Sequence, residues 1–483
     1  MPALSLQPIQ ARIAESTLSR GTQFAQIADF HRWLAKTAEH AYMNVDRIAL
    51  DRLIGWNHDG MTGNIGHQSG KFFTVEGLKV SFPESPVADW TQPIINQPEV
   101  GILGILVKEF DGVLHCLMQA KNEPGNHNGL QLSPTVQATR SNYTRVHQGR
   151  PVPYLDYFRD TSRHGVIADV RQSEQGSWFY QKRNRNMVVE VTEDVELLDG
   201  FCWLTLGQVH ELLTVPDLMN MDARTVLSCM PFSGAGLART FTPNVGDGFG
   251  TSLIRSCDPA EGALHHTDDI LSWITEMRSR VDVHAERTPL NGLRRWHHAD
   301  GKISHETGRF FDVIGVSVEA GGREVGGWTQ PMIEPVGTGI IAFLVKQIDG
   351  VLHALVHARV EPGYADVVEL APTVQCTPEN YDHLPAEARP PFLDEVLGAS
   401  PDRIRFDTVL SEEGGRFFSA RNRYLIIETD GDPGLGRPDF RWVAAHQLGE
   451  LLRHSYYLNV QARSLSACLH SLSTTRTTLL AQR

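Results

Sequence analysis

The chain has 483 residues, enough for two or three domains, and its 41% hydrophobic and 21% charged residues are typical of a globular protein. Its formal charge of −13 and pI of about 5.9 exclude a net positive field that would draw it to nucleic acid or to an anionic membrane. An anionic ligand would therefore need a local cluster of Arg or Lys.

The first twenty residues have no apolar core of signal-peptide length, and the longest apolar run, VGILGILV, ends at Lys108 and is too short to cross a bilayer. The six cysteines are scattered without a CxxC spacing, which favours reduced thiols over disulfides or a zinc site. The sequence thus predicts a cytoplasmic protein.

In the first half of the chain, the hydrophobic pattern predicts a helix, then strands, then helices. The first helix is expected to begin near Asp29, a suitable N-cap residue. A period of two, typical of strands, follows in KFFTVEGLKVSF, VGILGILVKEF, GVLHCLMQAK, LQLSPTVQAT and GSWFYQKRNRNMVVEV. Two helical patterns come last. These elements predict an α+β fold in which helices flank an antiparallel or mixed sheet.

The second half repeats the first. WTQP, GVLH, EPG, PTVQ and RNR each recur 238 residues later, and this offset holds from His67/His305 to Glu190/Glu428. A constant offset indicates gene duplication. We expect a first copy in residues 1–240, a linker in 241–265 and a second copy in 266–483. The linker is rich in Gly, Pro, Ser and Thr, and we interpret its GDGFG as a loop, because no strand precedes it.

The strand GVLHCLMQAKNE collects polar residues on one face. His115, Gln119, Lys121 and Glu123 alternate with apolar residues, and the second copy has His353, His357, Arg359 and Glu361 there. This face could line a pocket or simply meet solvent. The EPGN turn that follows would present Glu123 and Asn126.

The next stretch, LQLSPTVQATRSNYTRVHQG, mixes amide, phenol, guanidinium and imidazole groups, which suit recognition of a polyol and a base edge. Its retained PTVQ and NY could equally form a shared structural turn. The candidate binding residues from this region are Asn128, Gln131, Gln137, Asn142, Tyr143, Arg145 and His147, with Gln375 and Tyr381 as counterparts in the second copy.

Two further motifs could bind a nucleotide. Arg183 and Arg185 share one strand face, as do Arg421 and Arg423, and such pairs suit either a diphosphate or a structural salt bridge to Asp169 or Asp407. In WTQP, Trp90 and its counterpart Trp328 could stack on a base or pack in the core, and Gln92 and Gln330 are better ligand candidates.

Several chemistries have no signature in this sequence. HExxH, Walker A, GxSxG and EF-hand patterns are missing, and the 21 histidines show no metal-ligand spacing with a carboxylate. The sequence therefore predicts no metal site and no Cys/His/Asp nucleophile.

Taken together, WTQP…GVLH…QAKNEPGN…LSPTVQATRSNYTRVHQG…RNRN closely resembles the NDP-hexose 2,3-dehydratases, over nearly the whole chain. The resemblance implies two tandem Nudix-like domains per subunit, a homodimer, and a TDP-linked 4-keto-6-deoxyglucose as substrate. The catalytic Nudix box is missing; SEEGG at 411–415 is its nearest fragment. This departure makes metal-dependent diphosphate cleavage improbable.

The implied reaction removes the C3 proton, which the C4 ketone acidifies, and expels the C2 hydroxyl. It transfers no hydride, so no cofactor is expected, and a 3-ketoreductase would use the diketo product. The reaction needs a base, an acid and a donor to the C4 oxygen. Glu123 or His115 could be the base, and Lys121 or Tyr143 the donor or acid. Arg145, Arg183 and Arg185 could bind phosphate.

Differences between the copies favour the first as the active site. Retained pairs, such as His115/His353, are expected to serve the fold or a shared nucleotide site. Lys121, by contrast, is Arg359 in the second copy, and an Arg cannot donate a proton at accessible pH. The other differing pairs are Asn126/Tyr364, Asn128/Asp366, Gln131/Glu369, Arg145/His383 and His147/Pro385. Two alternatives stay open at this stage: a nucleotide-sugar-binding protein without turnover, and a diverged hydrolase of the same fold.

Overall fold

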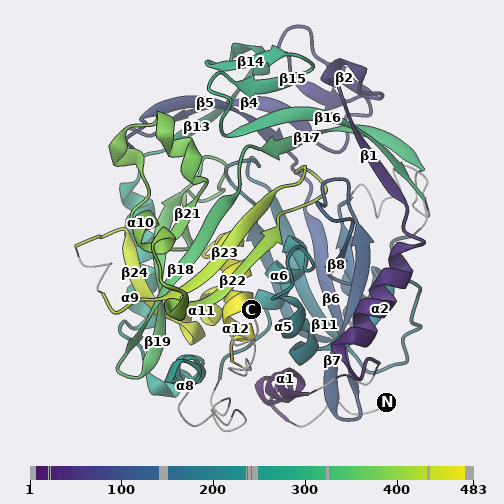
Figure 1. Cartoon of the computed structure of the whole chain (residues 1–483), viewed down its shortest axis with the longest axis vertical. Helices are drawn as coiled ribbons and strands as arrows, with labels where there is room; N and C mark the ends of the chain where they lie inside the picture. The colour runs from purple at the N-terminus through teal and green to yellow at the C-terminus, as the bar shows by residue number, and fades with distance from the viewer. Residues whose placement is uncertain are drawn as a thin grey trace.

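A computed structural model describes residues 7–19, 21, 23–140, 151–234, 237, 241, 248–321, 326–431 and 436–473. It shows an α+β protein in two repeated halves, with antiparallel and mixed sheets, which confirms the predicted fold class and duplication (Figure 1). Within the described residues, no helix is both long and apolar enough to cross a membrane.

Each copy forms a seven-stranded mixed sheet. The order in the first is β10-β11-β6-β7-β12, with β8 beside β7 and β9 beside β6; β6 and β11 run parallel, and the other paired strands named here run antiparallel. The strands are β6 (Gly101–Phe110), β7 (Val113–Asn122), β8 (Leu130–Ser133), β9 (Val136–Ala138), β10 (Gly165–Ser173), β11 (Arg183–Val191) and β12 (Phe201–Thr205).

The second copy repeats this arrangement as β20-β19-β18-β23-β22, with β21 beside β18 and β24 beside β19. The parallel pair is β18 and β23. The strands are β18 (Gly339–Ile348), β19 (Val351–Val360), β20 (Val368–Ala371), β21 (Val374–Cys376), β22 (Ile404–Ser411), β23 (Arg421–Glu428) and β24 (Phe440–Ala444).

Two five-stranded sheets lie across one end of the two seven-stranded sheets, at the top of Figure 1. Each of them contains one strand from the other copy. One contains β1 (Met43–Ile48), which pairs with β16 (Phe311–Ala320), and β14 (Trp296–Ala299), β15 (Lys302–His305) and β17 (Gly327–Pro335). The other contains β13 (His284–Thr288), which pairs with β4 (Thr74–Ser81), and β2 (Trp56–His58), β3 (Ile65–His67) and β5 (Asp89–Asn96). This exchange ties the two copies together.

The helices described in the first copy are α1 (Ile9–Leu18), α2 (Ile27–Ala38), α4 (Asp156–Arg159), α5 (Leu206–Leu212) and α6 (Met221–Ser228). Those after it are α8 (Gly248–Ser256), α9 (Thr267–Arg280), α10 (Leu393–Leu397), α11 (Ala445–Leu451) and α12 (Val460–Ser471). Short 3-10 turns are η1 (Leu50–Arg52), η2 (Pro259–Glu261), η3 (Leu290–Gly292), η4 (Pro378–His383), η5 (Ala386–Ala388) and η6 (Pro401–Arg403).

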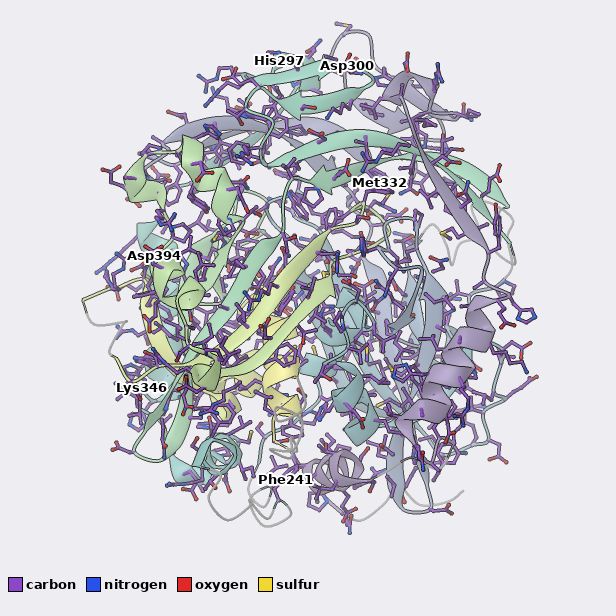
Figure 2. All side chains as sticks on the ribbon, viewed as in Figure 1. Phe241, His297, Asp300, Met332, Lys346 and Asp394 are labelled. Carbon is purple, nitrogen blue, oxygen red and sulfur yellow. The ribbon has the colours of Figure 1, made fainter. Side chains whose placement is uncertain are left out.

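One core joins the two copies. Val188 of the first sheet, Phe343 of the second and Leu465 of α12 belong to a single buried cluster. Side chains fill the space between the halves (Figure 2). The outer face of each seven-stranded sheet has its own smaller core, which includes Phe158 of α4 in one copy and Leu393 of α10 in the other. Burial of both faces explains the nearly continuous apolar runs of the central strands.

The segment expected to be a linker contains α8, so the loop predicted for GDGFG was wrong from Gly248 onward. In this helix Ser256 donates to the Leu352 carbonyl and accepts from the Ala445 amide. Ser16 of α1 makes the same pair of bonds, to Leu114 and from Leu206. Because α8 occupies in the second copy the place of α1 in the first, we propose that the second copy begins at α8.

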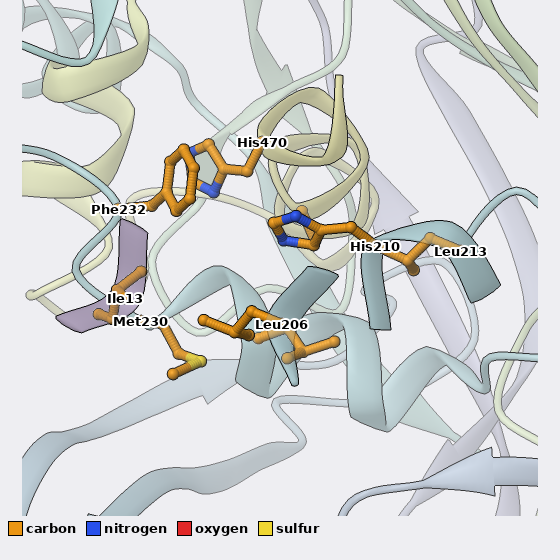
Figure 3. Close-up of a pocket in the computed structure, with 9 residues that line it drawn as sticks. Ile13, Leu206, His210, Leu213, Met230, Phe232 and His470 are labelled. Atoms are coloured by element: carbon orange, nitrogen blue, oxygen red, sulfur yellow. The ribbon is translucent and has the colours of Figure 1, made fainter. Parts of the chain in front are cut away.

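The contact between α5 and α12 buries two histidines in an apolar cavity (Figure 3). His470 stacks on Phe232 with ring centroids 4.6 Å apart. Burial, together with the nearby His470, lowers the pKa of His210 to about 3, and burial lowers that of His470 to about 4. Both side chains are therefore held neutral in the fold.

These histidines should make the protein sensitive to acid. Their folded pKa values lie below the unfolded value of about 6.5, so the unfolded chain binds more protons and stability falls as pH falls from there towards 4. Each histidine should cost about 2 kcal/mol of unfolding free energy between pH 7 and pH 5. Urea unfolding at both pH values measures this loss, which should shrink in a His210→Gln, His470→Gln double variant. Equal losses in the two proteins would contradict it.

Candidate active site

The EPG turn of each copy docks on a loop of the other copy. The Gly125 amide donates to the Gly414 carbonyl at 2.7 Å, and the Ser419 amide donates to the Gly125 carbonyl at 2.8 Å. A Cβ atom on Gly125 would lie 1.7 Å from the Phe417 carbonyl oxygen, so only glycine fits there. The reciprocal contact joins Gly363 to Gly176. Each strand end therefore meets residues from the opposite copy.

We call each contact between an EPG turn and the loop of the opposite copy a junction, the first being that of Gly125 and the second that of Gly363. The first junction holds a chain of hydrogen-bonded polar groups around Glu123. Lys121 Nζ lies 3.2 Å from Glu123 Oε1. Gln137 Nε2 donates to both Glu123 oxygens, at 3.1 and 3.2 Å, and Asn220 Nδ2 donates to Gln137 Oε1 at 3.2 Å. Three predicted site residues, Lys121, Glu123 and Gln137, thus come together, and Asn220 fixes the orientation of the glutamine.

Two carboxyl groups that the sequence reasoning missed lie beside this chain. Asp222, at the start of α6, is 4% exposed, and burial together with Glu174, Glu413 and Glu123 raises its pKa well above the usual value. Glu413 comes from the second copy and accepts from the Gly415 and Arg416 amides at 2.9 and 2.8 Å. Burial, and then the charge of Glu123, raise its pKa to about 7.

The alignment of the copies carried a signal for both groups. Asp222 aligns with Gln461, and Glu413 with Gln175. Both positions lie outside the stretches in which the copies were compared for polar differences. The sequence around them does not indicate that they lie near Glu123 in the fold.

Two cations border the cluster. Burial lowers the pKa of Lys182 to about 8, and its ammonium donates to the Glu99 carbonyl. The Arg416 guanidinium lies 4.4 Å from the centre of the Phe73 ring. The cluster therefore mixes carboxyl groups of raised pKa with positive charge, a combination common at catalytic sites.

The equivalent junction in the second copy carries bulkier groups. Arg359 Nε lies 3.0 Å from Glu361 Oε1, and Gln375 Nε2 donates to the same oxygen at 2.9 Å. Tyr364, 5% exposed, replaces Asn126, and Asn459 Nδ2 donates to its hydroxyl at 3.1 Å. Tyr381 packs against the outer core.

His115 is not brought to this cluster. It lies near the start of β7, six residues before Lys121, a separation of about 20 Å along a strand. Its Nδ1 lies 2.9 Å from the Val113 carbonyl oxygen, and burial lowers its pKa. His353 makes the same contact with Val351. Both belong to the fold at the far end of their sheets.

The polar residues in and after the EPGN turn form hydrogen bonds within the protein. Asn126 Nδ2 donates to the Gly129 carbonyl at 2.7 Å, and Asn128 Nδ2 to the Asp217 carbonyl at 3.2 Å. Gln131 is fully buried and donates to Ser411 of the second copy at 2.7 Å. Gln119 is half-buried on β7. The predicted site residues Asn142, Tyr143, Arg145 and His147 lie outside the described residues.

The WTQP motifs serve the opposite copy. Trp90 donates to Gln92 at 2.8 Å, and Gln92 donates to the Ser177 carbonyl at 2.7 Å, in the loop that meets Glu361 of the second copy. By the same pattern, Trp328 donates to Gln330, and Gln330 donates to the Gly415 carbonyl at 2.7 Å. Trp90 and Gln92 are therefore placed at the second junction, while Trp328 and Gln330 support the first.

Two of the four paired arginines form the expected salt bridges to Asp169 and Asp407. Arg185 binds Asp169 through two bonds of 2.7 and 2.6 Å, and Arg423 binds Asp407 in the same way. Arg421 lies 2.6 Å from Asp217. The fourth arginine, Arg183, is half-buried on β11, and its Nε has no hydrogen-bond partner among the described residues.

Comparisons with known proteins agree with this duplicated arrangement. A family model described as NDP-hexose 2,3-dehydratase matches residues 27–230 and again residues 267–469. A dTDP-4-dehydro-6-deoxy-α-D-glucopyranose 2,3-dehydratase of Saccharopolyspora spinosa is 53% identical over 466 residues, which cover 95% of each chain.

Two further enzymes of the same description are similar. The one from Amycolatopsis orientalis is 49% identical over 95% of this chain and 93% of its own. The one from Streptomyces violaceoruber is 48% identical over 92% and 97%. The matches span both copies and the junction between them, so the chain belongs to the NDP-hexose 2,3-dehydratase family.

Proposed function

We propose that this chain is a hydro-lyase that removes water across C2 and C3 of TDP-4-keto-6-deoxyglucose, in the biosynthesis of a deoxysugar of the kind found in antibiotics. The similar enzymes named above act on this sugar nucleotide. The observation that carries the proposal is the Lys121–Glu123–Gln137 chain, which holds a carboxylate beside an ammonium group at the end of β7.

The chemistry needs few protein groups. The C4 ketone acidifies the C3 proton, so Glu123 can remove it while Lys121 stabilises the oxygen of the resulting enolate. Loss of the C2 hydroxyl then leaves an enol at C3, which tautomerises to the 3,4-diketo-2,6-dideoxy sugar. No hydride moves, so the reaction needs no nicotinamide. Tyr143 remains a candidate donor, and we leave His115 out because of its distance along β7.

The first copy is the proposed catalytic one. Lys121 can donate a proton, whereas Arg359 is held by Glu361 and cannot. Tyr364 and Arg359 occupy the second junction, where the first has the smaller Asn126 and Lys121. We assign the second junction a supporting or accessory role.

Several finer features are part of the same proposal. Gln119, Arg145, His147, Asn142 and Arg183 would bind the diphosphate, sugar or base. A mixed sheet covered by helices on both faces, present twice, supports a Nudix-like fold. We further propose a homodimer in the cytoplasm, and coupling to a 3-ketoreductase, because a reactive 3,4-diketone needs prompt reduction.

The test is incubation of the chain with TDP-4-keto-6-deoxyglucose, with and without a 3-ketoreductase and NADPH. The chain alone should release free TDP and a sugar breakdown product. With the reductase, a TDP-2,6-dideoxy-4-ketohexose should accumulate, and in D₂O it should carry deuterium at C2. Release of TMP and sugar phosphate would indicate a hydrolase, and no turnover would indicate a binding protein; either result would reject the proposal.

A further inference from the structure

The loop 411–416 of the second copy is built into the first junction. The buried Arg224 of α6 donates to the Ser411 carbonyl at 2.8 Å, and Gln330 holds the other end through Gly415. Between these anchors, a Cβ on Gly414 would lie 2.2 Å from Asn126 Oδ1. The loop is therefore fixed against the EPGN turn from both ends.

Within this loop, Glu413 comes close to the carboxylate of Glu123. A Cβ placed on Gly415 would lie 2.5 Å from Glu413 Oε1 and 3.8 Å from Glu123 Oε1, so the two carboxyl groups flank one glycine. Glu413 is half-buried, and its side chain accepts two hydrogen bonds from amides of its own loop. A ligand at Glu123 would have Glu413 as a neighbour.

The reciprocal loop lacks this carboxyl group. Gln175 stands in place of Glu413, and its Nε2 donates to Glu412 Oε2 at 3.0 Å. At this loop position the second junction thus has an amide beside Glu361, where the first has a carboxyl group beside Glu123; the charge of Glu361 acts instead on the buried Glu369 of β20. An amide in the same loop of the other copy also shows that this loop conformation does not require an acid.

We propose that Glu413, supplied by the second copy, is the acid that protonates the departing C2 hydroxyl in the first. This inference rests on the proposed function and adds a group that the reaction needs. It makes the active site composite, since Glu123 and Lys121 come from one copy and Glu413 from the other.

With these two groups, every proton and electron pair in the reaction is accounted for. Glu123 takes the C3 proton, and the C3–H electrons form the enolate. They then form the C2–C3 double bond as the C2–O bond breaks, and the hydroxyl leaves as water with the Glu413 proton. After the proton on Glu123 has exchanged with solvent, tautomerisation delivers it to C2, while the enol proton at O3 restores Glu413.

The charged groups around Glu413 favour its protonated form near neutral pH. Glu123 faces it from the turn after β7, Glu174 from the loop after β10, and Asp222 from α6. Arg416 of its own loop and Lys182 oppose them. Burial and the carboxylates prevail, and the pKa of Glu413 stands at about 7.

The experiment compares wild type with Glu413→Gln in the full chain. Two readouts on TDP-4-keto-6-deoxyglucose are needed: deuterium exchange at C3 of unreacted substrate in D₂O, and TDP release. The variant should release TDP about a hundredfold more slowly but still exchange C3. Wild-type kcat should decline above about pH 7, whereas the variant should lack this decline.

The outcomes separate the two proposals. Wild type without TDP release rejects the proposed function itself. If wild type is active, unchanged release by a folded Glu413→Gln variant overturns the role of Glu413, and so does equal loss of exchange and release. Glu413→Asp, which retains a carboxylic acid, should recover part of the rate of TDP release. The role of Glu413 is also overturned if Glu413→Asp shows no recovery and Glu413→Gln keeps the wild-type pH profile of kcat. Thermal unfolding of each variant checks that the junction has formed.

Discussion

Replacing Lys121 with alanine should lower kcat about a hundredfold, because the substitution removes the ammonium proposed to stabilise the C4 oxyanion beside Glu123. The side chain of Lys121 is 18% exposed to solvent, so a ligand can reach it. Its loss should also cost stability, because Glu123, 10% exposed, loses its cation, but the two contacts with Gln137 remain and thermal unfolding checks that the variant is folded. Steady-state kinetics of TDP release measure the effect.

The matched control is Arg359→Ala at the equivalent position. Arg359 is ion-paired with a Glu361 side chain that is 2% exposed, so its removal should cost about 3 kcal/mol of unfolding free energy. Its effect on kcat should be small. Equal losses of kcat in two well-folded variants would show that both junctions are catalytic, or that one site is shared between them, and would contradict the assignment to the first copy.

Sequence patterns predicted the parts of this site that lie on one strand. The period of two placed Lys121 on the same face as Glu123, which lies just beyond the end of β7, and the EPGN turn followed as expected. The same rule grouped His115 with them, because periodicity defines a face but not which end of a long strand carries the site. Distance along the strand, rather than direction, separates His115 from the others.

The missing parts of the site depend on contacts between the copies. Glu413 is 290 positions from Glu123 in the chain, and only the docking of Gly125 on Gly414 brings them together. The strand exchange of β1 and β13 is equally non-local. Hydrophobic patterns report which face of an element is buried, not which copy buries it, so the sequence could not predict a composite site.

The exchange also changes how differences between the copies should be interpreted. Gln92 lies in the first copy but holds the loop at Glu361, and Gln330 of the second copy holds the loop at Glu123. A residue that differs between the copies can therefore report on the junction of the opposite copy. Glu413 and Gln175 are such a pair.

The largest kinetic effect is expected from Glu123→Gln. General-base catalysis contributes about 10²- to 10⁴-fold to rates, so loss of the base should lower kcat on the order of a thousandfold. The variant should also abolish deuterium exchange at C3, which distinguishes the base from the acid Glu413. Glutamine has the size of glutamate and can still accept from Gln137, so the site geometry should survive.

Glu361→Gln provides the control, because Glu361 lies in the equivalent chain of Arg359, Gln375 and Asn459. It removes the same charge from the second junction and should alter thermal stability more than kcat. NMR of the recovered substrate after incubation in D₂O gives the decisive measurement. C3 exchange at the wild-type rate in Glu123→Gln would mean that another group removes the proton. The buried Asp222 would then be the next base to test, because it belongs to the same copy and the charge of Glu123 contributes to its raised pKa.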